Sequence, residues 1–406
     1  MEISRTLIVK YKPNSEFCKL LADFRDMVNF AIREALRMGK YSIRKLHEVC
    51  YPHFKQKYNY STYYYSRAYR IASQIIRSYR RRDKEPRVKK LFVRLHKAQF
   101  KLEADKLKVS IRPREFINLE FELGKYQRKV IGKILAGELK VGEITVNENH
   151  VYIPFIEEVD VTEGSGKIAL DLNENEVVGV TDKGEVKRWS CSYIGKTREK
   201  YEAIRAKIQQ NVANHTRKFK RLMAKYGRIE RNKVRDFIHK LTRRIVNETV
   251  GLDLILEDLK GLRNSTNKRI KMFNVFSGKV QLCSINSAGF KGRWNSFPFR
   301  RIQFYLEYKK HLQGFHVHYV DRMNTSRVCS RCGGIIRSSD RACPRCGIDR
   351  DVNACINLLI KSGLTSPTLP PRNDLMNQTL TNQKMWTSLG RRTWEVEKGG
   401  VNIHPL

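Results

Sequence analysis

Apolar and polar residues alternate with a period of two at the start of the chain and again from residue 87 to residue 162. That period is typical of strands with one buried face, and short polar turns separate the alternating segments. The pattern therefore predicts a small antiparallel sheet. We expect residues 1–14 and 87–162 to form a β-barrel-like module.

The residues between these two parts follow a helical period instead. Apolar residues recur three and four positions apart from Ser15, the expected helix cap, to Met38, and again from Ser61 to Arg82. Residues 15–86 are therefore expected to be a helical insertion. Its second helix is rich in Tyr and Arg, which can stack on bases and pair with phosphates, although the same Tyr residues could equally be core residues.

Strands and longer helices alternate after a short linker, EGSG. The sequence predicts a three-stranded meander at 167–190, a helical hairpin at 199–250 with a break near Gly227, and a buried strand in GLDLILEDLKG. A helix in PFRRIQFYLEYKKHLQG, a strand in FHVHYVD and a helix in DVNACINLLIKSG follow. Residues 364–406 are polar and lack sustained periodicity, so we expect a largely disordered tail.

Positive charge dominates the composition of the 406-residue chain. Lys and Arg number 80 against 41 Asp and Glu, which gives a formal net charge of +39. Self-repulsion of this size favours a polyanionic partner, because each cation placed on a phosphate releases a condensed counterion. The charge argues against a small-molecule metabolic enzyme and a secreted disulfide scaffold. No apolar run approaches the length of a membrane span, so no membrane partner is expected.

The predicted helical hairpin concentrates this charge. Between Glu199 and Ile245 there are 15 Lys and Arg but only four Asp and Glu. A solvated helix normally mixes both signs, so the excess favours contact with nucleic acid. The candidate nucleic-acid-binding residues of the two helical regions are Tyr65, Arg67, Arg70, Arg77, Arg80, Arg217, Lys218, Arg221, Arg243 and Arg244.

Four of the nine cysteines form the most specific motif of the chain. Two Cys-x-x-Cys pairs, Cys329 with Cys332 and Cys343 with Cys346, are separated by ten residues. Each pair can turn two thiolates toward one centre, and four thiolates complete a closed tetrahedral Zn²⁺ site. A closed site leaves no position for water, so this zinc is expected to be structural and to fold a ribbon at residues 324–349.

Three acids stand at positions from which their side chains can meet. Asp171 lies in the first meander strand, Glu257 ends the apolar strand, and Asp351 opens the last helix, after Asp349 as the expected cap. Three hard oxygen ligands suit Mg²⁺, and two such ions about 4 Å apart activate a water and stabilise the leaving oxygen of a phosphodiester. This order of elements predicts an α/β, RNase H-like core.

Together these motifs resemble the TnpB family, transposon-encoded RNA-guided DNA nucleases related to the small type V CRISPR effectors. ILEDLKGL resembles the family's second acidic motif. The run from FPFRRIQF to CPRCGIDRDVNACINLL resembles its zinc ribbon, set between the second and third acidic motifs. The resemblance covers residues 165–363. It implies a RuvC-like, Mg²⁺-dependent endodeoxyribonuclease domain with an inserted ribbon, in which Asp171, Glu257 and Asp351 are the catalytic acids and Mg²⁺ ligands.

The resemblance also implies partners. They are a guide RNA made from the transposon end and a target double-stranded DNA, which is cut next to a short adjacent motif. It further implies a wedge role for the β-barrel-like module, a recognition role for the helical insertion, a monomeric chain and a cytoplasmic, nucleoid-associated location in a prokaryote. Two other classes compete: a non-cleaving zinc-ribbon repressor that binds RNA or DNA, and a cut-and-paste transposase. The transposase is disfavoured because no helix-turn-helix module precedes the core.

Overall fold

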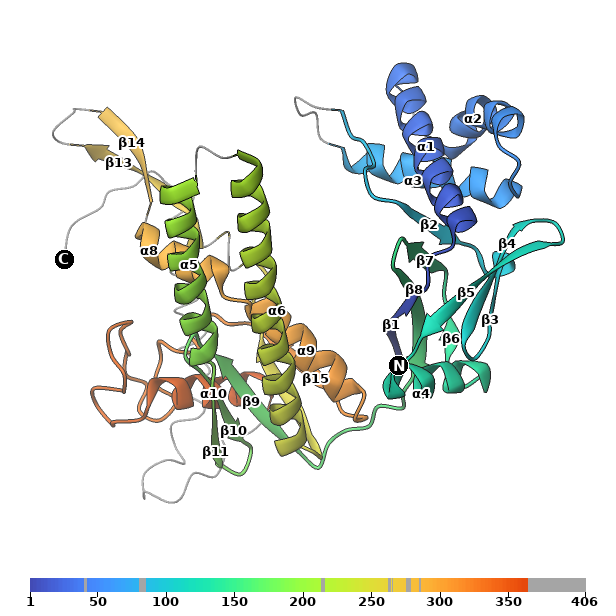
Figure 1. Cartoon of the computed structure of the whole chain (residues 1–406). Coiled ribbons are helices and arrows are strands. Elements are labelled where there is room, and N and C mark those ends of the chain that lie inside the picture. The colour runs from blue at the N-terminus through green and yellow to red at the C-terminus, as the bar shows by residue number, and fades with distance from the viewer. Residues whose placement is uncertain are drawn as a thin grey trace. The chain divides into compact units, whose positions relative to one another are not determined.

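The computed structural model describes residues 1–39, 42–79, 85–212, 216–261, 264, 266–274, 279–284 and 286–363. Its internal contacts divide the chain into two units, Met1–Val159 and Asp160–Leu406 (Figure 1). Arg80 and the expected tail at 364–406 lie outside the described residues. Within the described ranges, no helix is both long enough and apolar enough to cross a bilayer.

The first unit is built on an eight-stranded antiparallel sheet. Its strands are β1 (Glu2–Tyr11), β2 (Phe92–Leu95), β3 (Phe100–Leu102), β4 (Lys106–Arg112), β5 (Glu115–Glu122), β6 (Lys140–Val141), β7 (Ile144–Asn147) and β8 (His150–Glu158). They pair in the order β2-β7-β8-β1-β5-β4-β3, with β6 beside β8. The order begins at β2 and ends at β3, so hydrogen bonds among the described strands do not close the predicted barrel-like module into a complete barrel.

Helices interrupt this sheet at two places. The larger insertion, between β1 and β2, consists of α1 (Ser15–Met38), α2 (Ile43–Lys57) and α3 (Thr62–Ser78), and a short 3₁₀ turn (Lys97–Gln99) follows β2. The predicted first helix is confirmed, but its cap is Asn14, whose side chain accepts from the N–H of Glu16 at 2.8 Å. Two helices were not predicted: α2, which buries only a narrow apolar stripe and contains a proline, and α4 (Lys125–Leu135).

The second unit is centred on a five-stranded mixed sheet in the order β11-β10-β9-β12-β15. The strands are β9 (Gly166–Leu172), β10 (Glu176–Thr181), β11 (Val186–Ser190), β12 (Leu252–Glu257) and β15 (Val317–Val320). β9, β10 and β11 form the predicted antiparallel meander, while β12 lies parallel to β9 and β15 parallel to β12. The predicted order of a meander, a buried strand and a final helix is thus present, and the structure adds that β12 and β15 run parallel to β9.

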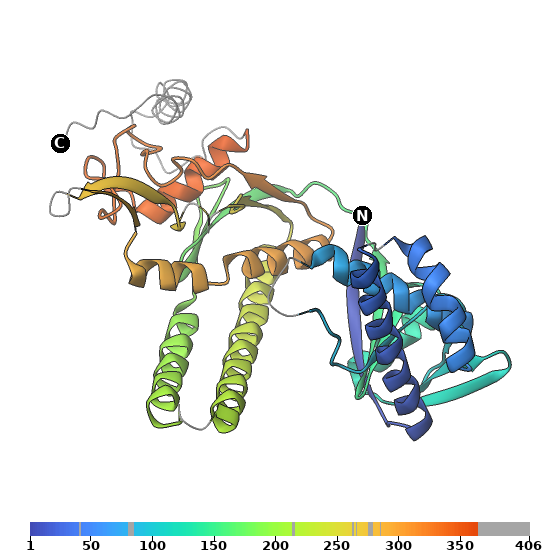
Figure 2. The same cartoon turned by 90° about the horizontal axis from the view of Figure 1, so that it is seen from above.

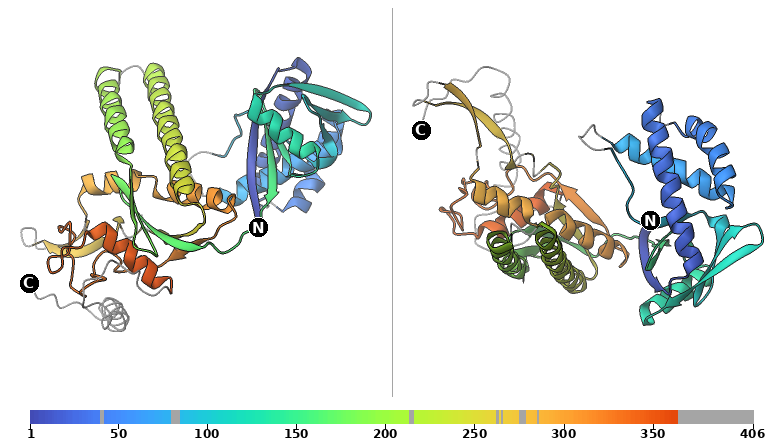
Figure 3. Two further views of the ribbon diagram at one scale, coloured as in Figure 1. Left: turned by 90° about the horizontal axis from the view of Figure 1, so that it is seen from below. Right: turned by 45° about the horizontal axis from the view of Figure 1, so that its top comes forward.

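Helices cover both faces of this sheet. α5 (Ser192–Val212), α6 (Thr216–Glu248) and α9 (Phe299–His311) share a core with Ile168 and Leu170 of β9. α10 (Arg350–Lys361) and the ribbon share a core with Ala169, which lies between those two residues and points the other way. The left view of Figure 3 shows α10 on the side of the sheet opposite α6.

The predicted helical hairpin is confirmed, but its break lies elsewhere. α5 and α6 run side by side (Figure 2) and are separated by residues 213–215. α6 continues through Gly227, because a glycine inside a helix costs only about 1 kcal/mol relative to alanine and a helix of 33 residues outweighs it. Also unpredicted are α8 (Ala288–Ser296) and a hairpin of β13 (Arg269–Asn274) and β14 (Lys279–Ser284).

Candidate functional site

The three predicted acids lie together at the end of the five-stranded sheet where the inner strands β9 and β12 finish. Asp171 on β9 and Glu257 on β12 each directly follow the registered pair Leu170–Leu256 of these parallel strands. Because side chains alternate along a strand, both acids lie on the face that α10 covers. Asp351 is the second residue of α10. Strand register and helix packing thus bring together three residues that lie far apart in the sequence.

Burial and mutual repulsion perturb the three carboxyl groups. Burial raises the pKa of Asp171, which is 8% exposed, well above its usual value, and the charges of Glu257 and Asp351 raise it further. Burial also raises the pKa of Glu257 and of Asp351, and Asp349 and Glu176 add to the effect at Asp351. Like charges held together in a partly dry site form an arrangement that a divalent cation stabilises.

Two neutral side chains hold these acids, and neither was predicted from the sequence. Asn173 donates from Nδ2 to Oδ2 of Asp171 at 2.9 Å, and its side chain also opposes the rise in the pKa of Asp351. Thr325 donates from Oγ1 to Oε1 of Glu257 at 2.7 Å. Both bonds favour the ionised carboxylate and oppose the effect of burial. Asn173 follows Asp171 closely in the sequence, which was a usable signal, whereas nothing in the sequence connects Thr325 with Glu257.

The helix that carries Asp351 is tied to the segment leading into the ribbon. Asn353 and Asn357, both buried and one turn apart on α10, donate to the carbonyl of Val328 at 2.9 and 2.7 Å. Asn357 also donates to the carbonyl of Thr325 at 2.7 Å. The two asparagines therefore connect Asp351, the ribbon and the side chain that holds Glu257.

Asp349 has the capping role that the sequence predicted. Its Oδ1 accepts from the backbone N–H groups of Asp351 and Val352, each at 3.0 Å, at the start of α10. Arg188 lies 3.2 Å from Asp349 and 2.8 Å from Glu176. Asp349 is thus engaged by the helix terminus and by an arginine.

The four ribbon cysteines form a compact ligand set. Among the residues that the structure describes, they are the one group of three or more Cys, His, Asp or Glu whose ligand atoms all lie within 4.8 Å of one another. Sγ of Cys329 is 3.4 Å from that of Cys346, and Sγ of Cys332 is 3.6 Å from that of Cys343. The set fits a tetrahedral Zn²⁺ with four thiolates. The three carboxylates lie farther apart than this limit.

The backbone of the ribbon prepares the cysteines for a metal. Gly333 and Gly347 each follow a Cys-x-x-Cys pair with φ of 67° and 70°, a left-handed conformation that favours glycine. Their N–H groups donate to the carbonyls of Cys329 and Cys343 at 3.0 and 2.8 Å and close two matching turns. Burial raises the pKa of Cys343, but backbone N–H groups outweigh it and lower that pKa to about 7. Burial raises the pKa of Cys329 and of Cys332 instead, and a bound cation favours the deprotonated form of all the ligands.

The candidate nucleic-acid residues of the first unit have different environments. Tyr65 is only 2% exposed and its hydroxyl bonds the carbonyl of Tyr58, so its ring packs in the core and cannot stack on a base. Arg67 is paired with Glu143. Arg70 and Arg77 are exposed. A cavity of about 190 Å³ lies beside these arginines. The charged residues of its lining are Arg67, Arg70, Arg77, Arg94 and Glu143.

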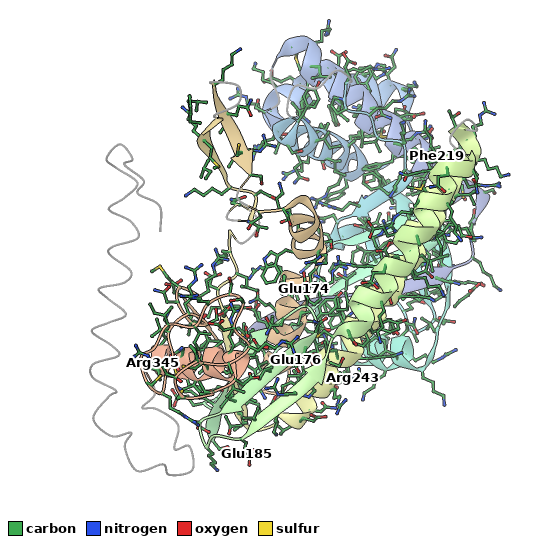
Figure 4. The ribbon with its side chains drawn as sticks, turned by 90° about the vertical axis from the view of Figure 1, so that its left-hand side faces the viewer. Glu174, Glu176, Glu185, Phe219, Arg243 and Arg345 are labelled. Carbon is green, nitrogen blue, oxygen red and sulfur yellow. The ribbon has the colours of Figure 1, made fainter. Side chains whose placement is uncertain are left out.

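The candidates on the helical hairpin do not form one patch. Arg217, Lys218 and Arg221 are exposed in the first turns of α6, whereas Arg243 and Arg244 are exposed near its end. A helix of 33 residues is about 50 Å long, so most of that length separates the two groups. Figure 4 shows the separation through Phe219, close to the first group, and Arg243 at the far end of the helix.

Comparison with known protein families covers both units. Residues 299–358 match the model of the Cas12f1-like TNB domain. Residues 149–265 match a family described as a probable transposase. Residues 20–110 match the uncharacterized protein MJ0013 family. Asp171 and Glu257 thus lie in the transposase match, and the ribbon and Asp351 lie in the TNB match.

Solved structures show a weaker likeness. A cryo-EM structure of a Cas12f1–sgRNA–target DNA complex matches with a TM-score of 0.45 and 14% identity, over 88% of this chain and 98% of that chain. A CRISPR-Cas12f ternary complex matches with a TM-score of 0.36 and 13% identity, over 86% of this chain and 82% of that chain.

Sequence relatives are closer. TnpB-like protein MJ0751 of Methanocaldococcus jannaschii is 30% identical over 292 residues, which span 69% of this chain and 99% of that protein. TnpB-like protein MJ1635 of the same organism is 23% identical over 329 residues, 76% of this chain and 70% of that protein. With near-complete coverage of MJ0751 at this identity, and with the acids and the ribbon in the order that the sequence predicted, the chain belongs to the TnpB family.

Proposed function

We propose that this protein is an RNA-guided DNA endonuclease encoded by a transposon, which cuts target DNA next to a short adjacent motif. The observation that carries the proposal is the meeting of Asp171, Glu257 and Asp351 at one edge of the sheet in a member of the TnpB family. Each acid comes from a separate element, and all three have raised pKa values.

The three acids are suited to hold Mg²⁺. They offer hard oxygen ligands with an excess of negative charge, which is the ligand type that Mg²⁺ prefers. When bound there, a pair of Mg²⁺ ions supplies an activated water and stabilises the leaving oxygen of a phosphodiester. Asn173 orients Asp171, and Thr325 orients Glu257. Both donors keep the carboxylates in the ionised form that a cation requires.

The basic surfaces supply the means to hold nucleic acid. The exposed cations at the two ends of α6 form two separate positive groups, each suited to the backbone of a duplex or heteroduplex. The arginine-lined cavity of the first unit offers a smaller anion site, suited to a phosphate of a structured RNA. Two nucleic-acid partners account for a net charge of +39 more readily than one duplex does.

The ribbon has a structural role in this scheme. Four thiolates fit a closed Zn²⁺ site, which has no open position for water and cannot by itself hydrolyse a phosphodiester. Asn353 and Asn357 connect this ribbon to the helix of Asp351, so a folded ribbon supports the geometry of the acids.

The decisive experiment is purification from cells, sequencing of any RNA that copurifies, and incubation of that complex with a DNA library with and without Mg²⁺. We expect retained RNA and RNA-dependent, Mg²⁺-dependent cleavage at sites that share an adjacent motif. Asp171→Ala should abolish cleavage and leave RNA retention intact. Asp258→Asn, which changes the acid next to Glu257 that bonds only the following turn, is the matched control and should cleave.

Three outcomes contradict the proposal. A chain that retains no RNA but binds transposon-end duplex DNA with sequence preference would be a cut-and-paste transposase. A chain that retains RNA and binds matching DNA without cutting it in Mg²⁺ would be a guided repressor. Loss of RNA binding in Asp171→Ala would show that this acid is structural.

A further inference from the structure

A cleft of about 890 Å³ opens in the second unit where β12 ends and α9 begins. None of the three acids lines it. Its floor is apolar and belongs to the core shared by α6, α9 and the sheet: Val234, Leu259, Phe297 and Phe299. Aromatic side chains form one wall, among them Trp294, Tyr305 and Phe304, which is 59% exposed. Trp294 and Tyr305 are half-buried, and one face of the Tyr305 ring stacks on His239, so Phe304 is the exposed ring of this wall. An aromatic wall above an apolar floor is suited to a flat, unsaturated ring.

The rim of the cleft is strongly cationic. Its charged lining consists of Arg198, Arg231, Lys260, Arg300, Arg301 and a single acid, Glu230. Glu230 is paired with Arg205 and also lies near Arg198, so it offsets only part of the positive charge of the rim. Burial lowers the pKa of Arg198, Glu230 and Glu174 oppose this effect, and the neighbouring Arg301 adds to it. Like charges so close together favour an anion between them.

We propose that this cleft binds a single-stranded segment of nucleic acid, with bases stacked on the wall formed by Trp294, Phe304 and Tyr305 and with backbone phosphates on the arginine rim. Aromatic faces combined with cations are the chemistry that recognises unpaired nucleotides, whose bases are free to stack. A duplex does not suit the cleft, because its bases stack on one another and expose only their edges. The inference rests on the proposed function for the biological source of the strand.

Residues near the cleft contact the ends of the strands that carry Asp171 and Glu257. Lys260 follows Glu257 closely at the end of β12, and Gln303 of α9 donates to the carbonyl of Glu257 at 2.7 Å. On the other strand, Arg293 of α8 lies 3.8 Å from Glu174, in the turn that follows Asp171. Figure 4 shows Glu174 in this turn and Glu176 at the start of β10. The cleft and the acids therefore lie at the same end of β12, on opposite faces of the sheet.

Crosslinking tests where a single strand binds. Full-length protein carrying Asp171→Asn, which keeps the strand uncut under the proposed function, is irradiated with a 4-thiothymidine DNA oligonucleotide or a 4-thiouridine RNA oligonucleotide. Crosslinked peptides are then mapped by mass spectrometry. We expect crosslinks at Trp294, Phe304 or Tyr305. Crosslinks confined to other peptides would overturn the proposal. The DNA and RNA arms show whether the strand belongs to the target or to the guide.

Equilibrium binding of the same oligonucleotides separates stacking from charge. Phe304→Ala should weaken binding about tenfold without changing the salt dependence, because one stacked base is lost. Arg301→Gln should lower the slope of log affinity against log salt by about 0.7, because one phosphate contact is lost. Phe116→Ala and Arg128→Gln, exposed residues of the first unit, are the matched controls and should change neither quantity.

These measurements do not depend on cleavage, so the two proposals fail separately. Crosslinks at the cleft in a protein that never cuts DNA would sustain the binding site and overturn the nuclease. RNA-guided cleavage that survives Phe304→Ala and Arg301→Gln, with no crosslink in 294–305 and unchanged affinity, would sustain the nuclease and overturn the binding site.

Discussion

Asp171 and Glu257 occupy equivalent positions on two adjacent parallel strands, each one residue beyond the registered pair Leu170–Leu256. Parallel neighbours require a long crossover, and the meander and the α5–α6 hairpin supply it. This crossover returns β12 beside β9 in the register that places the two carboxyl groups together. It also contains the basic helices α5 and α6.

Asp171→Asn should stabilise the protein while abolishing cleavage. Burial and the neighbouring acids raise the pKa of Asp171, so its ionisation is less favourable in the folded than in the unfolded state. Stability therefore falls as the pH rises through the interval between the ordinary and the raised pKa. In Mg²⁺-free buffer without chelator, we expect a melting temperature a few degrees higher at pH 8, and a smaller gain as the pH approaches the ordinary pKa of Asp. A lower melting temperature at pH 8 would show that Asp171 stabilises the fold.

Removal of zinc should release the ribbon and then the acids. Without the four thiolates held together, Val328 and Thr325 lose the fixed positions in which their carbonyls receive Asn353 and Asn357. In Cys343→Ser we expect less bound zinc, faster hydrogen exchange at residues 324–349 and loss of cleavage that added Mg²⁺ does not restore. Exchange in residues 1–159 serves as the internal control. Unchanged protection of the ribbon would contradict the zinc assignment.

Thr325→Val should impair cleavage without loss of zinc. The variant keeps the shape of the buried side chain but removes the donor to Glu257, whose pKa burial already raises. A hydrogen bond to a charged group contributes about 1.5–3 kcal/mol, so we expect cleavage at neutral pH to slow by about 10- to 100-fold. Because the defect is a further rise in pKa, raising the pH should restore part of the rate. Thr325→Ser retains the hydroxyl and should cleave, and equal defects in both variants would exclude this role.

Lys310 should make stability depend on pH above neutrality. Its side chain is fully buried, its Nζ donates to the carbonyl of Thr249, and burial lowers its pKa to about 8, opposed by Asp253. Burial also lowers the pKa of Lys309 to about 8, so Lys309 makes stability depend on pH in the same direction. Between pH 8 and 10.5 the unfolded chain binds more protons, so stability rises with pH.

Urea denaturation at pH 8.0, 8.75 and 9.5, followed by tryptophan fluorescence, measures this dependence. All four tryptophans follow residue 160, so the signal reports the second unit. Lys310→Met should flatten the rise in unfolding free energy relative to wild type, whatever its absolute stability. A rise of the same steepness in both proteins would assign the effect to other groups.

Local patterns of apolar and polar residues predicted most of the helices and strands. Strands with one buried face and helices with one buried stripe repeat at 2 and 3.6 residues, so the meander, α1, α9 and α10 could be predicted. α2 could not, because its buried stripe is only Leu46, Cys50 and Phe54 and Pro52 interrupts the signal. The break expected at Gly227 was wrong, because helix propensity is a small term beside the packing of α6 along α5 and α9.

Chemistry that resides in short motifs was likewise visible in the sequence. The two Cys-x-x-Cys pairs predicted a zinc site, and the four sulfur atoms lie within 4.8 Å of one another. The net charge of +39 favours a polyanionic partner. It did not show which residues meet that partner: Tyr65, expected to stack on a base, is a core residue, because the face that a tyrosine presents depends on the neighbours of its helix.

The sequence by itself determined the family, the order of the acids and the ribbon, and the need for a polyanion, because these reside in residue types and short spacings. Only the tertiary structure decided that Asn173 and Thr325 bond the carboxylates of Asp171 and Glu257, that Asn353 and Asn357 link the ribbon to the helix of Asp351, and that an aromatic, cationic cleft opens on the other face of the sheet. Those contacts join residues far apart in the chain. They depend on strand register and on helix packing, which no local pattern encodes.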